Sequence, residues 1–125
     1  MKGLISNIYA IERKDERTNN SEWESYGNKM LLWHGTTAQN IVGILQSGFR
    51  IGPSNAGFNG TLFGKGVYFA DTISKALVYT HNYHYHNRNK SKKVEKKYVF
   101  LCEVLLGTMK EYVSPTQPPK TIPGK

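Results

Sequence analysis

The chain has 125 residues, enough for one domain with an apolar core but not for two such cores. Its composition, 38% hydrophobic and 21% charged, is that of a globular protein, and its formal net charge of +8 favours anionic partners such as nucleic acid, a pyrophosphate or an acidic protein. The single cysteine, Cys102, excludes an internal disulfide and a zinc site built from several thiolates.

The sequence contains no signal-peptide core and no apolar stretch of membrane-spanning length. We therefore expect an intracellular protein, nuclear or cytoplasmic and not secreted, with no membrane association. The compartment itself cannot be read from the residues.

Two strands and a helix are predicted in the first half of the chain. Residues 4–11 are rich in β-forming residues, and residues 30–33 form a short apolar run before a glycine. A helix is predicted from Thr37, its candidate N-cap, to Gln46, because Ile41, Ile44 and Leu45 recur at helical spacing. Gly48 stands in the usual stop position. Gly43 weakens this helix by roughly 1 kcal/mol relative to alanine, and close packing against a strand would explain it.

The second half begins with a glycine-rich loop and a short strand. Residues 67–70 are predicted to be extended, and Asp71 is a credible N-cap for a second helix that carries Tyr79. Residues 98–106 give the clearest strand pattern, and because both faces are mostly apolar we expect a central strand.

The domain prediction is a single unit over residues 1–125, with a basic loop at 81–97 and an irregular, proline-rich tail at 113–125. Several short strands with two interspersed helices and no alternating strand–helix rhythm indicate the α+β class.

His34 is the first candidate for chemistry. A histidine at a strand end beside a glycine can exchange a hydrogen bond with a ligand hydroxyl in a cleft. A structural histidine satisfied in the core is the alternative. Downstream, Gly60, Gly64 and Gly66 permit close backbone approach, but their spacing matches neither the phosphate loop nor the dinucleotide fingerprint, so a tight hairpin remains equally open.

Three further side chains fit a planar anionic ligand. Tyr68 and Tyr79 stand just outside a glycine turn and a helix end, where their rings are able to sandwich a flat heterocycle, although core packing explains them too. Arg50 offers a fork of donors for a phosphate, with a surface ion pair as the alternative.

The segment 81–97 suggests two other partners. His81, His84 and His86 form a weak metal signal, because no carboxylate or cysteine is near and lysines surround them. The basic run that follows the histidines resembles a phosphate-binding or single-strand-binding patch, and a solvated loop is the simpler interpretation.

An ordered set of motifs resembles the catalytic domain of poly(ADP-ribose) polymerases. The similarity runs without a gap from Leu31 to Tyr79, and weaker similarity covers residues 8–13 and 103–107. The residues that carry it are Leu31-Leu32-Trp33-His34-Gly35-Thr36, Asn40, Gly43-Ile44-Leu45, Gly48, Arg50-Ile51, Phe63-Gly64-Lys65-Gly66-Val67-Tyr68-Phe69-Ala70-Asp71 and Ser74-Lys75.

The resemblance implies an ADP-ribosyltransferase fold, with small antiparallel sheets and two short helices around an NAD⁺ cleft. It implies that His34 binds ribose, that the Gly35 backbone holds the nicotinamide carboxamide, and that Tyr79 stacks on the nicotinamide ring while Tyr68 closes the pocket. Thr36, Asn40 and Arg50 match positions that contact the adenosine half. These assignments make His34 and Tyr68 the candidate catalytic residues, with NAD⁺ as co-substrate, no metal and a protein as acceptor.

Two departures from the family pattern bear on activity. Ala76 stands where the family has a serine that helps hold the carboxamide, a loss of roughly 0.5–1.5 kcal/mol if nothing replaces that bond. The family's catalytic glutamate lies on a strand beyond Lys125, and neither Glu103 nor Glu111 is assigned its role. We therefore expect a strand edge and some apolar core surface to be left uncovered. Either a partner chain covers them, or the chain is a fragment that is only marginally stable by itself.

The sequence thus predicts an NAD⁺ ADP-ribosyltransferase, with transfer weakened or absent in the chain as it stands. The alternative is a non-catalytic module that binds NAD, ADP-ribose or a nucleic-acid end through the basic loop. A fragment with no function of its own is the third possibility.

Overall fold

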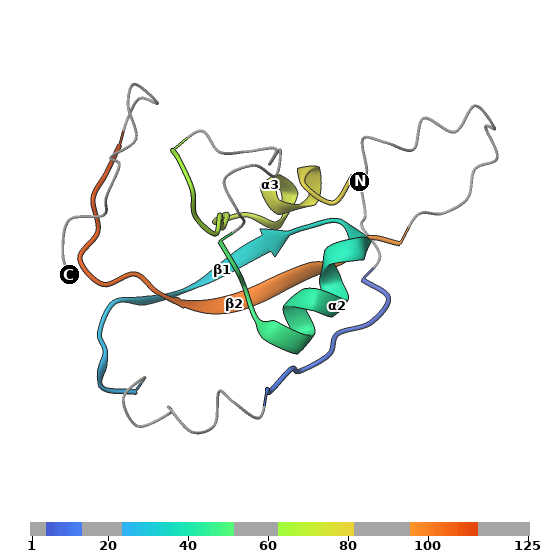
Figure 1. The fold of residues 1–125 in the computed structure, drawn as a ribbon, viewed down its shortest axis with the longest axis horizontal. Helices are drawn as coiled ribbons and strands as arrows, with labels where there is room; N and C mark the ends of the chain where they lie inside the picture. The colour runs from blue at the N-terminus through green and yellow to red at the C-terminus, as the bar shows by residue number, and fades with distance from the viewer. Residues whose placement is uncertain (1–4, 14–23, 52–62, 82–95, 113–125) are drawn as a thin grey trace.

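The fold is built on a two-stranded antiparallel sheet in the computed structural model (Figure 1). Strand β1 spans Lys29–Gly35 and strand β2 spans Val99–Leu105. They pair along their whole length, with Lys29 opposite Leu105 and Gly35 opposite Val99. Both predicted strands, 30–33 and 98–106, are therefore confirmed. The residues that the structure describes are 5–13, 24–51, 63–81 and 96–112.

Hydrogen bonds from Asn28 to Gly107 and from Leu106 to Asn28 join the chain at one end of this sheet. Both residues have positive φ, 59° and 58°, a conformation that asparagine and glycine adopt more readily than other residues. The Asn28 side chain donates from Nδ2 to the Gly107 carbonyl oxygen at 2.6 Å, and the Leu106 N–H donates to the Asn28 carbonyl oxygen at 3.0 Å. The register of the strands is thereby held at the end away from His34.

The two faces of the sheet differ in how well they are covered. Alternation places His34 and Phe100, which are paired across the strands, on one face, and both are half-buried. Leu31 and Leu101 lie on the other face and are 66% and 51% exposed. Within the described residues β2 has one neighbouring strand, β1, so its predicted central position is not borne out there.

Helix α2 (Ala38–Ser47) follows β1 closely and agrees with the predicted helix to within one residue. Thr37 occupies the N-cap position but makes no side-chain cap bond. Its carbonyl oxygen accepts the Asn40 N–H at 3.0 Å. At the other end Gly48 has φ +74° and donates its N–H to the Ile44 carbonyl. A Cβ at Gly43 would meet nothing within 4 Å, so the expected close packing of this glycine is wrong.

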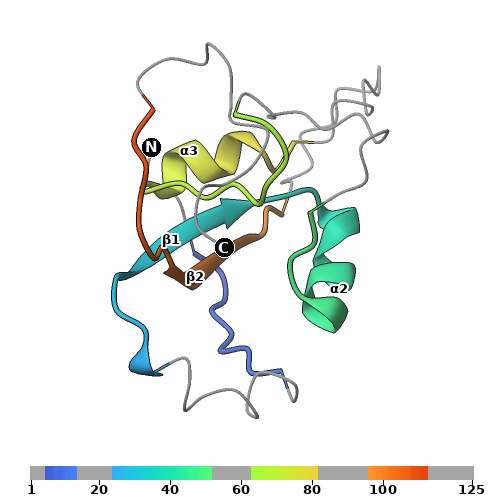
Figure 2. The ribbon, with the colours of Figure 1, turned by 60° about the vertical axis from the view of Figure 1, so that its left-hand side comes forward.

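The segment that leads into helix α3 (Ile73–Val78) touches β1 at one point. Trp33 and Ala70 exchange two backbone hydrogen bonds of 2.7 Å, an isolated antiparallel bridge. The predicted strand at 67–70 is therefore reduced to a single bridge. Thr72, and not Asp71, is the N-cap residue of α3, again without a side-chain bond. Figures 1 and 2 show α2 and α3 against different sides of the sheet.

The described part of the N-terminal segment, residues 5–13, is irregular, so the strand predicted at 4–11 is wrong for residues 5–11. β-propensity makes a strand only where a neighbour accepts its ladder bonds, and no described segment pairs with this one. Its apolar side chains remain in solvent, as the 85% exposure of Ile8 shows. At its end the Arg13 guanidinium lies next to Gly48, where a Cβ would overlap it.

Few described side chains are fully buried. They lie where α3 meets β1 and where α2 begins: Ala70, Ala76, Thr80 and Thr36. The described residues contain no helix that is both long and apolar enough to cross a membrane. The arrangement of a small antiparallel sheet with short helices is compatible with the predicted α+β class. The domain limits, the basic loop 81–97 and the tail 113–125 stay predictions, because most of both segments lies outside the described residues.

Candidate functional site

His34 stands near the end of β1, with its imidazole held by the main chain of a distant segment. Its Nδ1 atom lies 2.8 Å from the carbonyl oxygen of Tyr68. A carbonyl oxygen only accepts hydrogen bonds, so Nδ1 carries the hydrogen and donates it. In the neutral ring the remaining nitrogen, Nε2, is then an acceptor available to a ligand.

Three phenylalanine rings surround this imidazole. Phe49 is nearest, edge-on with its ring centroid 4.7 Å from that of His34, and Phe69 and Phe100 follow at 5.6 and 6.4 Å. The rings come from three segments: the segment that follows the Gly48 C-cap of α2, the bridge segment beside β1, and β2. Burial lowers the pKa of His34 below 6.5, and the hydrogen bond to Tyr68 opposes that shift only in part. A neutral imidazole is the favoured form.

Tyr68 acts on its own loop as well as on His34. Its hydroxyl donates to the Gly64 carbonyl oxygen and accepts the Phe63 N–H at 3.2 Å. Gly64 has φ +92°, a conformation that favours glycine. The tyrosine therefore closes the turn 63–68 with its side chain while its carbonyl holds the histidine, and its ring remains 37% exposed.

Gly35 brings β1 against the backbone of α3. A Cβ on Gly35 would overlap the carbonyl oxygen of Ala76, which is 1% exposed. The same carbonyl accepts the Tyr79 N–H at 3.1 Å. The Ala76 carbonyl oxygen thus lies against Gly35 and also binds the Tyr79 backbone. Tyr79 itself is 45% exposed.

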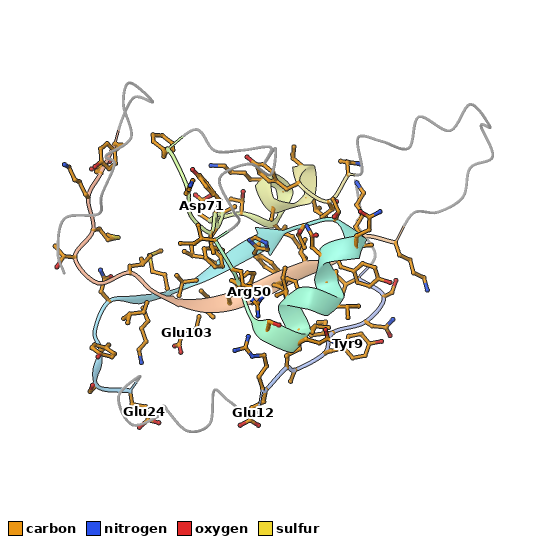
Figure 3. The ribbon with its side chains drawn as sticks, in the orientation of Figure 1. Tyr9, Glu12, Glu24, Arg50, Asp71 and Glu103 are labelled. Atoms are coloured by element: carbon orange, nitrogen blue, oxygen red, sulfur yellow. The ribbon has the colours of Figure 1, made fainter. Side chains whose placement is uncertain are left out.

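Thr36 and Asn40 are joined at the start of α2. The Asn40 side chain donates from Nδ2 to the Thr36 hydroxyl at 3.0 Å, and Thr36 is buried to 9% exposure. Arg50 is exposed, in the segment after α2 that rises across the sheet (Figures 1 and 2). Figure 3 labels its side chain.

The sequence-predicted site residues therefore fall into adjacent groups along β1 and its neighbours. His34 and Tyr68 are bonded to each other, Gly35 lies against the helix that ends at Tyr79, and Thr36 is bonded to Asn40. Within the described residues no ring contact joins Tyr79 to His34 or Tyr68. A sandwich of a flat ligand between the two tyrosines stays a prediction.

Sequence reasoning missed the aromatic surroundings of His34. Phe100 was available from the strand alternation, but nothing in the local pattern indicated that Phe49 would cross to the same face. It also did not predict the contacts of Tyr112. The ring centroids of Phe63 and Tyr112 are 6.3 Å apart, and the Lys110 Nζ atom lies 5.2 Å from the Tyr112 ring centroid.

The predictions for the histidine-rich and lysine-rich segment fall mostly outside the described residues, including those for His84 and His86. At its margins the Lys97 Nζ and His81 Nε2 atoms are 3.0 Å apart. Among the described residues no group of three or more histidine, cysteine or acidic side chains is placed to hold a metal ion.

Comparison with known proteins gives a match over the whole chain. The family model described as the poly(ADP-ribose) polymerase catalytic domain matches residues 1–125. The chain is 41% identical over 107 residues to rice poly [ADP-ribose] polymerase 2-B, covering 86% of this chain and 16% of that protein. It is 41% identical over 108 residues to Arabidopsis thaliana poly [ADP-ribose] polymerase 1, covering 86% of this chain and 10% of that one. It is 36% identical over 121 residues to the Gallus gallus polymerase 1, covering 97% and 11%.

Proposed function

The chain belongs to the poly(ADP-ribose) polymerase catalytic-domain family, and from that premise we propose that it binds NAD⁺ between β1, the turn 63–68 and α3. The proposed reaction is transfer of ADP-ribose to an acceptor, with release of nicotinamide. The family match over residues 1–125 is the observation that carries the proposal. The chain spans between 10% and 16% of the length of the relatives compared above. The activity of those whole proteins is therefore a proposal for this chain.

The arrangement around His34 supports a role in binding the nicotinamide ribose. Its Nδ1 is occupied by the Tyr68 carbonyl, which leaves Nε2 to accept a hydrogen bond from a ribose hydroxyl. A neutral ring also suits this place, since a cationic imidazole would repel the positive pyridinium of NAD⁺. The low pKa that burial gives His34 therefore fits the proposed ligand.

The surroundings of Gly35 support a role for its backbone in holding the carboxamide. Its lack of a side chain lets β1 approach the Ala76 backbone, an approach that any Cβ on Gly35 would prevent. Ala76 itself offers no hydroxyl, so the carboxamide would be held with one bond fewer than in relatives that have serine there. Tyr79 and Tyr68 are proposed to stack on and close over the nicotinamide ring, and their partial exposure leaves surface for such contacts.

Thr36, Asn40 and Arg50 are proposed to face the adenosine half. The bond between Asn40 and Thr36 fixes two polar side chains at the start of α2. The exposed guanidinium of Arg50 is a suitable donor for a pyrophosphate. The three residues would together extend the site away from the nicotinamide end.

In the proposed transfer the bond between the ribose anomeric carbon and the nicotinamide nitrogen breaks. Nicotinamide leaves with the electron pair, the sugar passes through an oxocarbenium-like state, and an acceptor nucleophile adds to the same carbon while losing its proton. His34 would orient the ribose, and the rings around it would exclude water from one side of it.

A carboxylate that polarises the acceptor is not assigned among the described residues. Glu103 lies opposite Leu31, on the sheet face away from His34. Figure 3 shows it beside β2, across the two strands from Asp71. Glu111 is exposed beyond β2. We therefore expect NAD⁺ binding to be retained more fully than transfer.

The binding proposal is tested by the effect of NAD⁺ on thermal unfolding of the 125-residue chain. A ligand present at one hundred times its dissociation constant stabilises by about 2.7 kcal/mol, so a clear rise in the midpoint is expected with millimolar NAD⁺. His34→Ala should lose most of that rise. His81→Ala, at an exposed histidine three residues beyond α3, is the matched control and should keep it. An unchanged midpoint for the parent chain would contradict the proposal.

Transfer is tested separately with labelled NAD⁺. Label on protein that disappears in His34→Ala supports an active transferase and excludes the alternative of a purely non-catalytic binding module. Stabilisation by NAD⁺ without any label supports that alternative, which the net charge of +8 also favours. A protein acceptor and an intracellular location stay predictions.

A further inference from the structure

Phe49 is the hub of the aromatic cluster around His34. Its ring centroid lies 4.7 Å from His34, 5.4 Å from Phe69 and 5.9 Å from Phe100, and each contact is edge-on. No other ring of the cluster comes as near to the imidazole. Edge-to-face pairs of this kind fix the relative orientation of the rings as well as their separation.

Phe49 reaches this place because α2 ends where it does. Gly48, at φ +74°, turns the chain out of the helix, and Phe49 is the next residue. The segment then rises across the sheet between α2 and the strands (Figure 2). Phe49 thus comes from outside the sheet, whereas His34 and Phe100 are paired within it.

The imidazole is constrained on two sides. The Tyr68 carbonyl fixes Nδ1 at 2.8 Å, and the Phe49 edge lies against the ring at an interplanar angle of 67°. A hydrogen bond alone allows the imidazole to swing about the bond axis, whereas a ring packed against its side blocks that motion. The remaining nitrogen, Nε2, is then presented in one direction.

We propose that Phe49 is a positioning residue for His34, holding the imidazole against the Tyr68 carbonyl so that Nε2 is presented as a hydrogen-bond acceptor to a ligand hydroxyl. This inference rests on the proposed function for the identity of the ligand, the ribose of NAD⁺. The orientation and tautomer of His34 are properties of the ligand-free protein, and they are testable without NAD⁺.

Ionisable groups near His34 could also shift its pKa, so their positions matter for a titration of this histidine. On β2, Cys102 shares the face of Phe100, while Glu103 lies on the opposite face. Arg50 follows Phe49, and Asp71 follows the bridge segment; both are exposed. Helix α2 carries no ionisable side chain, and the Tyr68 phenol is engaged with the turn 63–68. The described contacts of His34 are a carbonyl and three phenyl rings, so desolvation by those rings dominates its titration.

The test is a nuclear magnetic resonance titration of histidine ring nitrogens in the labelled 125-residue chain without ligand. The parent chain should show His34 as the Nδ1–H tautomer, with a pKa below 6.5. Phe49→Leu keeps an apolar side chain but removes the ring, and should move the pKa of His34 toward 6.5 and mix the two tautomers. Phe49→Ala should move it further. Ile51→Ala, two residues on and 60% exposed, is the control and should leave His34 unchanged.

Several outcomes would overturn the inference. An Nε2–H tautomer in the parent chain would do so, as would an unchanged His34 titration in folded Phe49→Leu and Phe49→Ala. Loss of the cooperative unfolding transition in both variants would show that Phe49 is only structural. If the tautomer and its Phe49 dependence are as expected but NAD⁺ gives no stabilisation, the proposed function fails while the positioning role stands. If NAD⁺ binds equally well to parent chain and Phe49→Leu across the pH range, the positioning role fails alone.

Discussion

At His34, burial and hydrogen bonding act on protonation in opposite directions, and burial is the larger effect. The surrounding phenyl rings cannot solvate a charged imidazole, so the neutral form is favoured in the folded state. The Tyr68 carbonyl accepts a hydrogen bond from either form and recovers only part of that cost. The balance at this one side chain has a consequence for the stability of the whole chain.

The stability of the folded chain should fall as the pH is lowered below 6.5. The pKa of His34 is lower folded than its ordinary value of 6.5, so in the interval between the two the unfolded state binds more protons. The contribution of neutral His34 to the free energy of unfolding is complete above pH 6.5. It is lost as the pH falls through the pKa of His34 in the folded state. Urea midpoints at about pH 7.5 and about pH 5.5 measure it. His34→Asn should show a smaller difference between the two, and an equal difference would contradict the assignment.

Gly35→Ala should destabilise the chain, because the new Cβ would overlap the Ala76 carbonyl oxygen, a backbone atom that cannot rotate away. Forcing a methyl group into such a contact typically costs about 1–3 kcal/mol. The thermal midpoint should fall accordingly. Gly27→Ala is the matched control, since a Cβ there would meet nothing within 4 Å. Equal midpoints for the two variants would show that β1 and α3 are not packed as described.

The sequence was sufficient to identify His34 and Gly35 as candidates because their neighbours form an ordered motif around them. It was not sufficient to find Phe49 as the nearest ring to His34. That contact depends on the path the chain takes after α2, and a phenylalanine after a helix stop has no local feature that distinguishes a core ring from a site ring.

The end of α2 was predictable from the sequence. The stop at Gly48 follows from backbone sterics, since its φ of +74° with ψ of −174° is a region that residues with a Cβ rarely enter. Starts were less predictable. Thr72, and not Asp71, precedes α3, and neither N-cap side chain makes its expected bond. Both segments begin from extended residues whose carbonyls already accept the first helical bonds.

Replacement by alanine should change stability in opposite directions at Gly43, inside α2, and at Gly48, its C-cap. Gly48→Ala should cost about 1–3 kcal/mol, because the backbone there suits only glycine. Gly43→Ala should stabilise by about 0.5–1 kcal/mol, because a Cβ in the helix interior meets open space. Urea midpoints of the two variants measured side by side give the comparison. A gain at position 48 or a loss at position 43 would contradict the described helix.

Strands were predicted well only where the chain supplies both partners. Residues 30–33 and 98–106 pair with each other, and both were found from apolar pattern alone. Residues 67–70 form one bridge to Trp33, and residues 5–11 pair with no described segment. A strand is completed by its neighbour, and a local pattern does not indicate whether that neighbour is present.

On the scale of the whole molecule, the described part of the chain leaves many large apolar side chains exposed to solvent. Leu31 and Leu101 share one exposed face of the sheet, and Ile8 and Val42 lie exposed elsewhere. Exposed apolar side chains that share a face, as Leu31 and Leu101 do, favour association. Their exposure also limits the stability that burial is able to provide in the described part of the chain.

Replacing Leu31 and Leu101 together by glutamine should reduce self-association with little loss of stability. Both side chains are more than half exposed, and surface substitutions of this type usually change stability by about 0.5 kcal/mol or less. Light scattering and binding of a hydrophobic dye should both fall. Val42→Gln, on α2 and 60% exposed, serves as the control for adding polarity elsewhere. Unchanged scattering in the double variant would show that this face does not mediate association.

The pairing of β1 with β2 also sets an order of events during translation. Residues 29–35 leave the ribosome early, but the strand that completes their ladder is residues 99–105. At about 5–20 residues per second, the nascent strand waits roughly 3–13 seconds for its mate. Until β2 is made, the only described backbone partner of β1 is Ala70, through its single bridge to Trp33. The delay before this ladder can form is therefore set by the distance between the two strands along the sequence.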